Sequence, residues 1–259
     1  MVEAAARPKL RVAVLKCDNP LAVIQERYGS YGDIFEKLLK QGQAGAALDE
    51  KSDLAVSKWD VADQQTYPRL EDVDAVLLTE ANVDGNAEDP WILTLLRFVQ
   101  EAYRMCIPIL GVCFGHQVIA RALGATVRRS DCYEISATTV SLTSSGSSLF
   151  DGKQNLVLHQ MHRDVVESVP AGCKSIGSSA RCEIHGLYQP GRIMTLQGHP
   201  EFDQFMVERA ASSRAEQGIL SEEVAKDGIA RAELPHDGDL VARAMYRFVW
   251  QASKAPRRV

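Results

Sequence analysis

A cysteine at the apex of a strand-to-helix turn is the feature that most constrains the fold of this chain. The turn, GVCFGHQ at residues 111–117, follows an apolar run at 106–110 that predicts a strand, and it leads directly into a helix-like run at 118–124. A reactive residue between glycines on such a turn forms a nucleophile elbow, which raises its side chain above the edge of a sheet. There the helix dipole and the unpaired N–H groups favour a thiolate, so Cys113 is a candidate nucleophile.

The first half of the chain alternates strand-like and helix-like segments. Three apolar or alternating runs predict strands, at 10–15, 54–59 and 74–79. After a loop at 28–32, Asp33 can cap a helix, and Pro90 fits the first turn of another helix that extends to about Tyr103. Through Gly124 the order β-α-β-β-α-β-α is typical of a mostly parallel sheet with helices on both faces.

The second half of the chain has a different pattern of apolar and polar residues. Short alternating segments predict a β-rich, partly antiparallel element, with strands at 137–142, 156–159, 165–169, 181–188 and 192–196. Three helices are predicted beyond it, at 202–216, 221–232 and 239–252. No repeat, low-complexity tract or linker interrupts the sequence, so we expect one domain over residues 1–259, closed by C-terminal helices at about 202–252.

Composition narrows the class of protein. Hydrophobic residues make up 46% of the chain and charged residues 24%, as in ordinary soluble proteins. The net charge of -5 argues against a nucleic-acid or anionic-membrane partner. No apolar run approaches the roughly 18 residues of a membrane span, and the N-terminal residues lack the apolar core of a signal peptide. Six scattered cysteines without a CxxC pair indicate neither a disulfide framework nor a zinc site, which favours a reducing, cytoplasmic compartment.

A second motif, QGHPE at residues 197–201, supplies the partners that a thiol nucleophile needs. Histidine can take a proton from the thiol and return it to a leaving nitrogen near neutral pH. Residues i and i+2 of an extended segment point the same way, so Glu201 can orient the imidazole of His199. The candidate triad is therefore Cys113, His199 and Glu201. The alternatives are a buried core cysteine, a structural histidine and a carboxylate at a helix N-terminus.

The two motifs together resemble those of the class I glutamine amidotransferase-like family. The similarity extends over about residues 9–218, and it is greatest to stand-alone, GMP-synthase-like amidotransferase proteins of fungi and to plant γ-glutamyl peptidases. Segments 28–33, 88–92 and 160–164 carry that closer match. The resemblance implies an α/β, flavodoxin-like three-layer fold with a central mostly parallel sheet and an additional small antiparallel β element. It also implies hydrolysis of a γ-glutamyl amide through a thioester.

The resemblance implies a role for each matching residue. Cys113 would attack the γ-carbonyl, and His199, held by Glu201, would manage the protons. The backbone N–H of Phe114 would donate one oxyanion hydrogen bond, because it opens the helix after the nucleophile. Gln117, one turn into that helix, would help to hold the glutamyl portion of the substrate.

Further residues are candidates for the substrate pocket. His162 and Asp164 lie where the family builds part of its pocket wall. Tyr28 and Tyr31 lie in a loop after the first strand, where open α/β sheets place ligands. His159, His162 and His185 share no metal-ligand spacing, so structural roles are favoured and we predict neither a metal nor a cofactor.

One position departs from the family pattern. The relatives commonly carry a glycine in the loop after the third core strand, which supplies the second oxyanion donor, whereas this loop reads Thr79-Glu80-Ala81-Asn82. Either the oxyanion hole at Glu80 and Ala81 is only partly formed and the substrate differs from glutamine, or the side chain of Glu80 turns outward and only its backbone N–H contributes to the oxyanion hole. Loss of one donor costs about 2.7–4 kcal/mol of transition-state stabilisation.

Three functions are compatible with these features. The first is a cysteine hydrolase of specialised metabolism that cleaves a γ-glutamyl peptide or a glutathione-type conjugate. The second is a glutaminase that passes ammonia to a separate synthase subunit, since the sequence contains no phosphate loop or room for an ATP-binding module. The third is a pseudoenzyme that binds a glutamyl ligand. The expected partners are a small-molecule γ-glutamyl substrate and, for the second function, that synthase, with no nucleic acid and no membrane.

Overall fold

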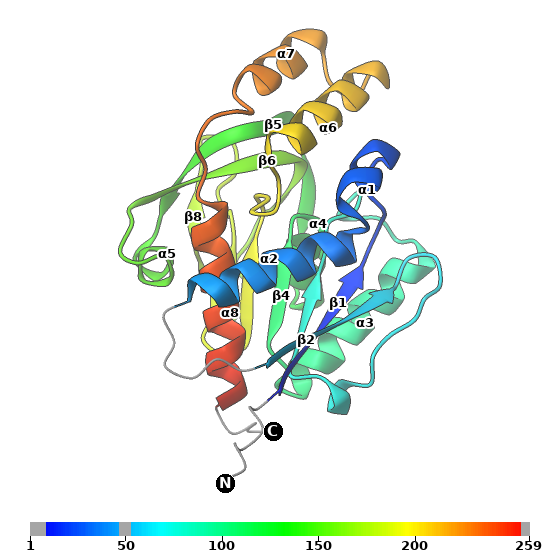
Figure 1. Ribbon diagram of the computed structural model, residues 1–259, viewed down its shortest axis with the longest axis vertical. Coiled ribbons are helices and arrows are strands. Elements are labelled where there is room, and N and C mark those ends of the chain that lie inside the picture. The colour runs from blue at the N-terminus through cyan, green and yellow to red at the C-terminus, as the bar shows by residue number, and fades with distance from the viewer. Residues whose placement is uncertain (1–8, 47–52, 255–259) are drawn as a thin grey trace, which may run out of the picture.

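Two β-sheets of unequal size organise the computed structural model, which describes residues 9–46 and 53–254 (Figure 1). The larger sheet has the strand order β2-β1-β3-β4-β10-β9-β7. Its members are β1 (Lys9–Lys16), β2 (Asp53–Asp60), β3 (Ala75–Leu78), β4 (Ile109–Val112), β7 (Lys174–Ser175), β9 (Leu187–Gln189) and β10 (Ile193–Leu196). The first five strands in this order are parallel, and β9 and β7 continue the sheet in antiparallel fashion.

Helices cover both faces of the large sheet and complete three layers. On one face lie α2 (Tyr31–Gly45) and α8 (Gly238–Lys254), which cross in front of the strands in Figure 1. On the other face lie α3 (Pro90–Arg104) and α4 (Phe114–Ala122). Successive side chains of β1 enter different cores, because a strand alternates its side chains between the two faces. The fold is therefore of the flavodoxin-like class that the family resemblance implied.

A small antiparallel sheet rises beyond the carboxyl ends of the parallel strands. It consists of β5 (Val127–Leu142), β6 (Asn155–Val166) and β8 (Gly177–Ser178), with α5 (Ser144–Leu149) at one end of the ribbon. The helices α6 (Gln204–Glu216) and α7 (Glu222–Ala230) lie above the bend of the ribbon, where α7 packs against Ile135 of β5 (Figure 1). An isolated bridge between His159 and His199 joins β6 to the segment after β10. The ribbon is thus attached directly to the QGHPE motif.

Most elements occur where the sequence predicts them, but the first helical region differs. A helix that the sequence analysis did not predict, α1 (Ala22–Tyr28), precedes α2, so the expected loop at 28–32 is shorter. Asp33 does not cap α2, because Ser30 is the N-cap and Asp33 is the third residue of the helix. The two side chains form a reciprocal capping box.

Three predicted strands are displaced or absent. The strand expected at 106–110 is observed as β4 at Ile109–Val112, because Cys106 has a positive φ of 57° at the turn after α3. Of the strand expected at 165–169, only residues 165 and 166 are in a strand, at the end of β6. Most of the strand expected at 181–188 is a loop, in which the hydroxyl of Ser179 accepts hydrogen bonds from the backbone N–H groups of Arg181 and Cys182. None of the described helices is both long and apolar enough to cross a membrane.

Candidate active site

Cys113 stands at the junction of β4 and α4, in a backbone conformation that side chains rarely adopt. Its φ and ψ angles are 53° and -107°, and it is the N-cap of α4. The glycines on either side permit close packing of the strand against the helix. A Cβ atom on Gly111 would lie 2.5 Å from Cδ1 of Ile119, and one on Gly115 would lie 2.4 Å from the carbonyl oxygen of Leu78. The turn therefore requires small residues at both positions, and it directs the sulfur to the carboxyl edge of the sheet.

His199 follows the end of β10, and contacts to its ring and to its backbone hold it in place. Its Nδ1 lies 2.8 Å from Oε1 of Glu201, so the carboxylate holds the tautomer and orientation of the imidazole. The ring stacks on Phe202 with centroids 4.1 Å apart, and its backbone N–H donates to the carbonyl of His159 at 2.8 Å. The imidazole is fully buried. This arrangement leaves Nε2 as the ring nitrogen that does not contact Glu201.

The sulfur, the imidazole and a carboxylate meet in one cluster. The polar atoms of Cys113, His199 and Glu80 all lie within 4.8 Å of one another. Burial acts to lower the pKa of His199, but the charges of Cys113, Glu201 and Glu80 raise this pKa well above its ordinary value. Gln197 also contributes, because its Nε2 lies 3.5 Å from the sulfur of Cys113. The site therefore favours the imidazolium form of His199.

Glu80 turns into this site, which excludes the alternative in which its side chain points outward. The carboxylate is buried and accepts a hydrogen bond from the hydroxyl of Tyr31. Its Oε2 lies 3.4 Å from Nε2 of His199, the nitrogen that would exchange a proton with the thiol. Burial raises the pKa of Glu80 to about 6, although the charge of His199 acts in the opposite direction. A carboxylate with this placement competes with Cys113 for the imidazole.

A polar pocket opens beside Cys113. Its lining comes from the loop after β3, from α4, from the antiparallel ribbon and from α6, and includes Ala81, Asn82, Asp84, Gln117, Arg129, Tyr133, His162, Asp164 and Arg214. The side-chain amide of Gln117 donates to the carbonyl of Asp164 at 3.1 Å and to Oε1 of Gln197 at 3.0 Å. The carboxylate of Asp164 accepts from Nε of Arg129 at 3.1 Å. Gln117 and Asp164 thus form one hydrogen-bonded wall.

The remaining candidate residues do not all reach the pocket. Tyr31 contacts Glu80, whereas Tyr28 donates to Asp203 and lines a separate hollow behind the QGHPE segment. The ring of Phe114 packs against Trp91 with centroids 5.7 Å apart and does not line the pocket, and the oxyanion role of its backbone N–H stays a prediction. His162 lines the pocket, but its Nε2 lies 3.1 Å from Glu134, outside the Cys113 cluster.

Several site residues were not identified from the sequence. Arg129 and Tyr133 lie on β5 and Arg214 lies on α6, and no local motif marks any of them as functional. They reach the pocket only because the ribbon and α6 fold over the edge of the sheet. Gln197 was detectable in principle, since it precedes His199 by two residues in an extended segment and therefore points the same way.

The comparisons with known proteins agree with this architecture. The family model described as glutamine amidotransferase class-I matches residues 36–206, and the chain belongs to the class I glutamine amidotransferase family. A glutamine amidotransferase-like protein of Schizosaccharomyces pombe is 31% identical over 245 residues, which cover 92% of this chain and 98% of that protein. Gamma-glutamyl peptidase 2 of Arabidopsis thaliana is 28% identical over 86% of this chain and 90% of its own length. A glutamine amidotransferase structure from Thermotoga maritima, 20% identical, superimposes with a TM-score of 0.71 over 93% of this chain and 98% of that chain.

Proposed function

We propose that this protein is a cysteine hydrolase that cleaves γ-glutamyl amides through a thioester. The observation that carries the proposal is the convergence of the Cys113 sulfur and the His199 imidazole at the carboxyl edge of the sheet, with Glu201 bonded to Nδ1. A nucleophile, a base within reach of it and a group that orients the base are the parts that acyl transfer requires.

The chemistry follows from these positions. The Cys113 thiolate attacks the γ-carbonyl carbon, the carbonyl electron pair moves to oxygen, and the resulting oxyanion accepts a hydrogen bond from the N–H of Phe114. The C–N bond then breaks as Nε2 of His199 gives its proton to the leaving nitrogen. In the second half of the reaction His199 takes a proton from water, and the hydroxide attacks the thioester and releases glutamate and the thiolate.

Features of the pocket support a γ-glutamyl peptide or conjugate as the substrate. Arg129 and Arg214 line it together with Asp164, so it offers both cationic and anionic partners to the α-carboxylate and α-amino groups of a glutamyl moiety. Glu80 also occupies the loop position where the family resemblance implies a glycine that supplies an oxyanion donor for glutamine. The likeness to gamma-glutamyl peptidase 2 over most of both chains agrees with this substrate class.

A three-substrate assay tests the proposal. Release of ammonia or glutamate is measured with glutamine, glutathione and a γ-glutamyl conjugate, for the wild-type protein and for Cys113→Ala. We expect turnover of a γ-glutamyl peptide or conjugate and a loss of at least about 10³-fold in Cys113→Ala, with an unchanged circular dichroism spectrum. Full activity in Cys113→Ala would show that Cys113 is not the nucleophile. Hydrolysis of glutamine alone would show that γ-glutamyl peptides and conjugates are not the substrates.

A second candidate is a glutaminase activated by a separate synthase. The position of Glu80 favours this candidate, because a residue that occupies the base in the isolated chain could be withdrawn by a partner. The proposal of a stand-alone hydrolase predicts no stoichiometric partner. Co-purification of a synthase in equal amounts, with glutamine hydrolysis that appears only in the complex, would establish the second candidate.

A further inference from the structure

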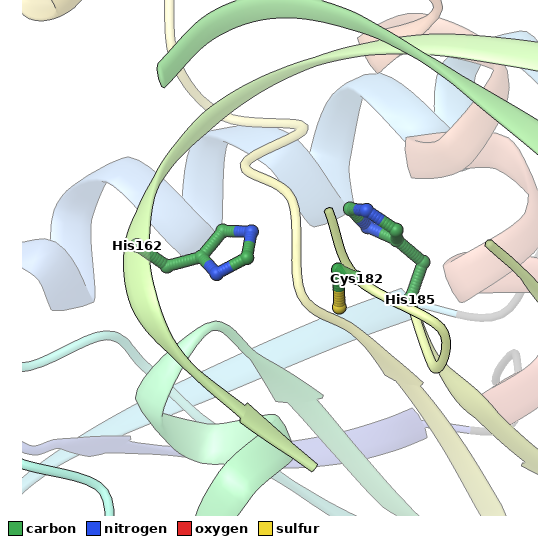
Figure 2. Close-up of side chains that lie close together, drawn as sticks. All are labelled: His162, Cys182 and His185. Atoms are coloured by element: carbon green, nitrogen blue, oxygen red, sulfur yellow. The ribbon is translucent and has the colours of Figure 1, made fainter. Parts of the chain in front are cut away.

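A second buried cluster of chemically active side chains lies outside the Cys113 site. It comprises Glu134 on β5, His162 on β6, and Cys182 and His185 in the loop between β8 and β9. Their exposed fractions are 4%, 5%, 2% and 1%. Figure 2 shows the two imidazoles on either side of the Cys182 side chain. Four polar or ionisable groups at this depth need partners that satisfy them, because the burial of such groups without partners is costly.

The donor atoms of this cluster face one another at short range. One ligand atom from each of His162, Cys182 and His185 lies within 4.8 Å of the other two. Oε2 of Glu134 lies 3.1 Å from Nε2 of His162 and 3.0 Å from Nε2 of His185. The edges of a tetrahedral zinc site measure about 3.3–3.8 Å, so a modest inward movement of the side chains suffices to reach that geometry.

The two contacts of the His162 ring leave a pair of hydrogen-bond acceptors facing each other. Its Nδ1 lies 3.2 Å from the carbonyl oxygen of Asp164, which can only accept, so Nδ1 must carry a hydrogen. Nε2 then holds a lone pair in the neutral ring, yet it faces the Glu134 carboxylate, which also accepts. A cation between Nε2 and Glu134 would satisfy both groups.

His185 and Cys182 lead to the same conclusion. Nε2 of His185 is buried and makes no aligned hydrogen bond within the described part of the chain, although it lies beside Glu134. The sulfur of Cys182 lies within 4.8 Å of a ring nitrogen of each of the two imidazoles, and it would bind a metal ion as the thiolate, with loss of its proton.

The surrounding residues orient the cluster as a supporting shell does at metal sites. The hydroxyl of Ser179 donates to Oε1 of Glu134 at 2.6 Å and accepts the backbone N–H of Cys182 at 3.1 Å. The Nδ1–H of His162 donates to a backbone carbonyl, which is the usual arrangement of a histidine that binds metal through its other nitrogen. Ser179 therefore links two candidate ligands, Glu134 and Cys182, in one hydrogen-bonded unit.

We propose that Glu134, His162, Cys182 and His185 bind one zinc ion in a closed, tetrahedral structural site. One thiolate and one carboxylate balance the charge of the divalent ion, and the mixture of sulfur, imidazole and oxygen ligands suits zinc. The ion would fasten the 179–186 loop to β5 and β6, beside the wall of the pocket that contains Asp164. The proposal departs from the sequence prediction of no metal, and it does not depend on the proposed hydrolase activity.

Metal analysis of the purified protein tests this proposal. Tag-free protein is expressed with added zinc, desalted without chelator, and analysed by inductively coupled plasma mass spectrometry. We expect about one zinc ion per chain in the wild-type protein and less than about a tenth of that in Cys182→Ser. Cys173→Ser is the matched control, because it removes a partly buried thiol from outside the cluster and should leave the zinc content unchanged.

A second readout identifies which thiolate holds the ion. Cobalt replaces zinc in the metal-free protein, and the sulfur-to-cobalt charge-transfer band is compared in Cys182→Ser and Cys113→Ser, with circular dichroism to verify folding. We expect the band to disappear only in Cys182→Ser. Its loss in Cys113→Ser alone would assign the metal to the Cys113 cluster and overturn the proposal. Wild-type protein that retains no zinc after loading would overturn it as well.

Discussion

At the scale of single residues, Glu80 departs from the pattern that the family resemblance implies. The resemblance predicts a glycine at this position, and the sequence leaves the direction of the glutamate side chain open. The structure turns the carboxylate inward, where the hydroxyl of Tyr31 and the imidazole of His199 compensate part of its burial. A buried carboxylate beside the proposed catalytic base is expected to affect both stability and turnover, and each effect can be measured.

The buried carboxyl of Glu80 makes the stability of the protein depend on pH. Its folded pKa of about 6 exceeds the ordinary value of 4.5, so the folded state binds more protons between these two values. The free energy of unfolding therefore falls as pH rises from about 4.5 to about 6, by about 2 kcal/mol for this group. We expect Glu80→Gln to be more stable than the wild type at pH 7, and the difference to disappear below pH 4.5. Urea denaturation at both pH values measures this, with the exposed Glu26→Gln as a control that should show no such difference.

Turnover should respond to the same side chain. Replacement of Glu80 by glycine removes a negative charge from beside the developing oxyanion and frees Nε2 of His199 for Cys113. We expect kcat/KM for glutamine to rise about tenfold, which corresponds to about 1.4 kcal/mol of transition-state stabilisation. Steady-state kinetics of Glu80→Gly and Glu80→Gln separate the loss of charge from the change in backbone freedom. A fall in activity in both variants would show that Glu80 takes part in the reaction.

At the scale of secondary-structure elements, the elbow is specified almost completely by local sequence. The glycines on either side of Cys113, the apolar run before it and the helix-forming run after it lie within twenty residues, so no distant contact is needed to recognise them. The exact limits of β4 were not predictable. They depend on the positive φ of Cys106 and on pairing with β3 and β10, which the local sequence does not encode.

Packing at the elbow predicts a large effect of a single methyl group. Gly115→Ala would place Cβ 2.4 Å from the backbone oxygen of Leu78, which cannot move without distortion of β3. We expect a loss of about 1–3 kcal/mol of unfolding free energy, measured by chemical denaturation. Gly45→Ala is the matched control, since its Cβ would meet the flexible side chain of Arg243 at 2.9 Å. Equal effects of the two substitutions would contradict the packing argument.

At the scale of the whole molecule, the active site is assembled from segments that are distant in the sequence. The elbow, the loop after β3 and the segment after β10 meet because parallel strands end at the same edge of the sheet. The ribbon of β5 and β6 then closes over that edge. Arg231 near the end of α7 secures it by donating to the backbone carbonyls of Ala137 at 2.6 Å and Ile135 at 3.0 Å. The expectation that residues 1–259 form one domain is compatible with this arrangement and stays a prediction.

The sequence alone determined the parallel α/β core, the strand-to-helix turn and the two motifs that mark the candidate triad. These features depend on local periodicity, on turn residues and on short spacings, all of which are present in a linear chain. Only the tertiary structure decided that Glu80 faces His199, that Tyr28 lies apart from Cys113, and that Glu134, His162, Cys182 and His185 converge. Those outcomes depend on which distant residues become neighbours when the ribbon folds over the sheet. The balance between desolvation and new polar contacts exists only after that folding.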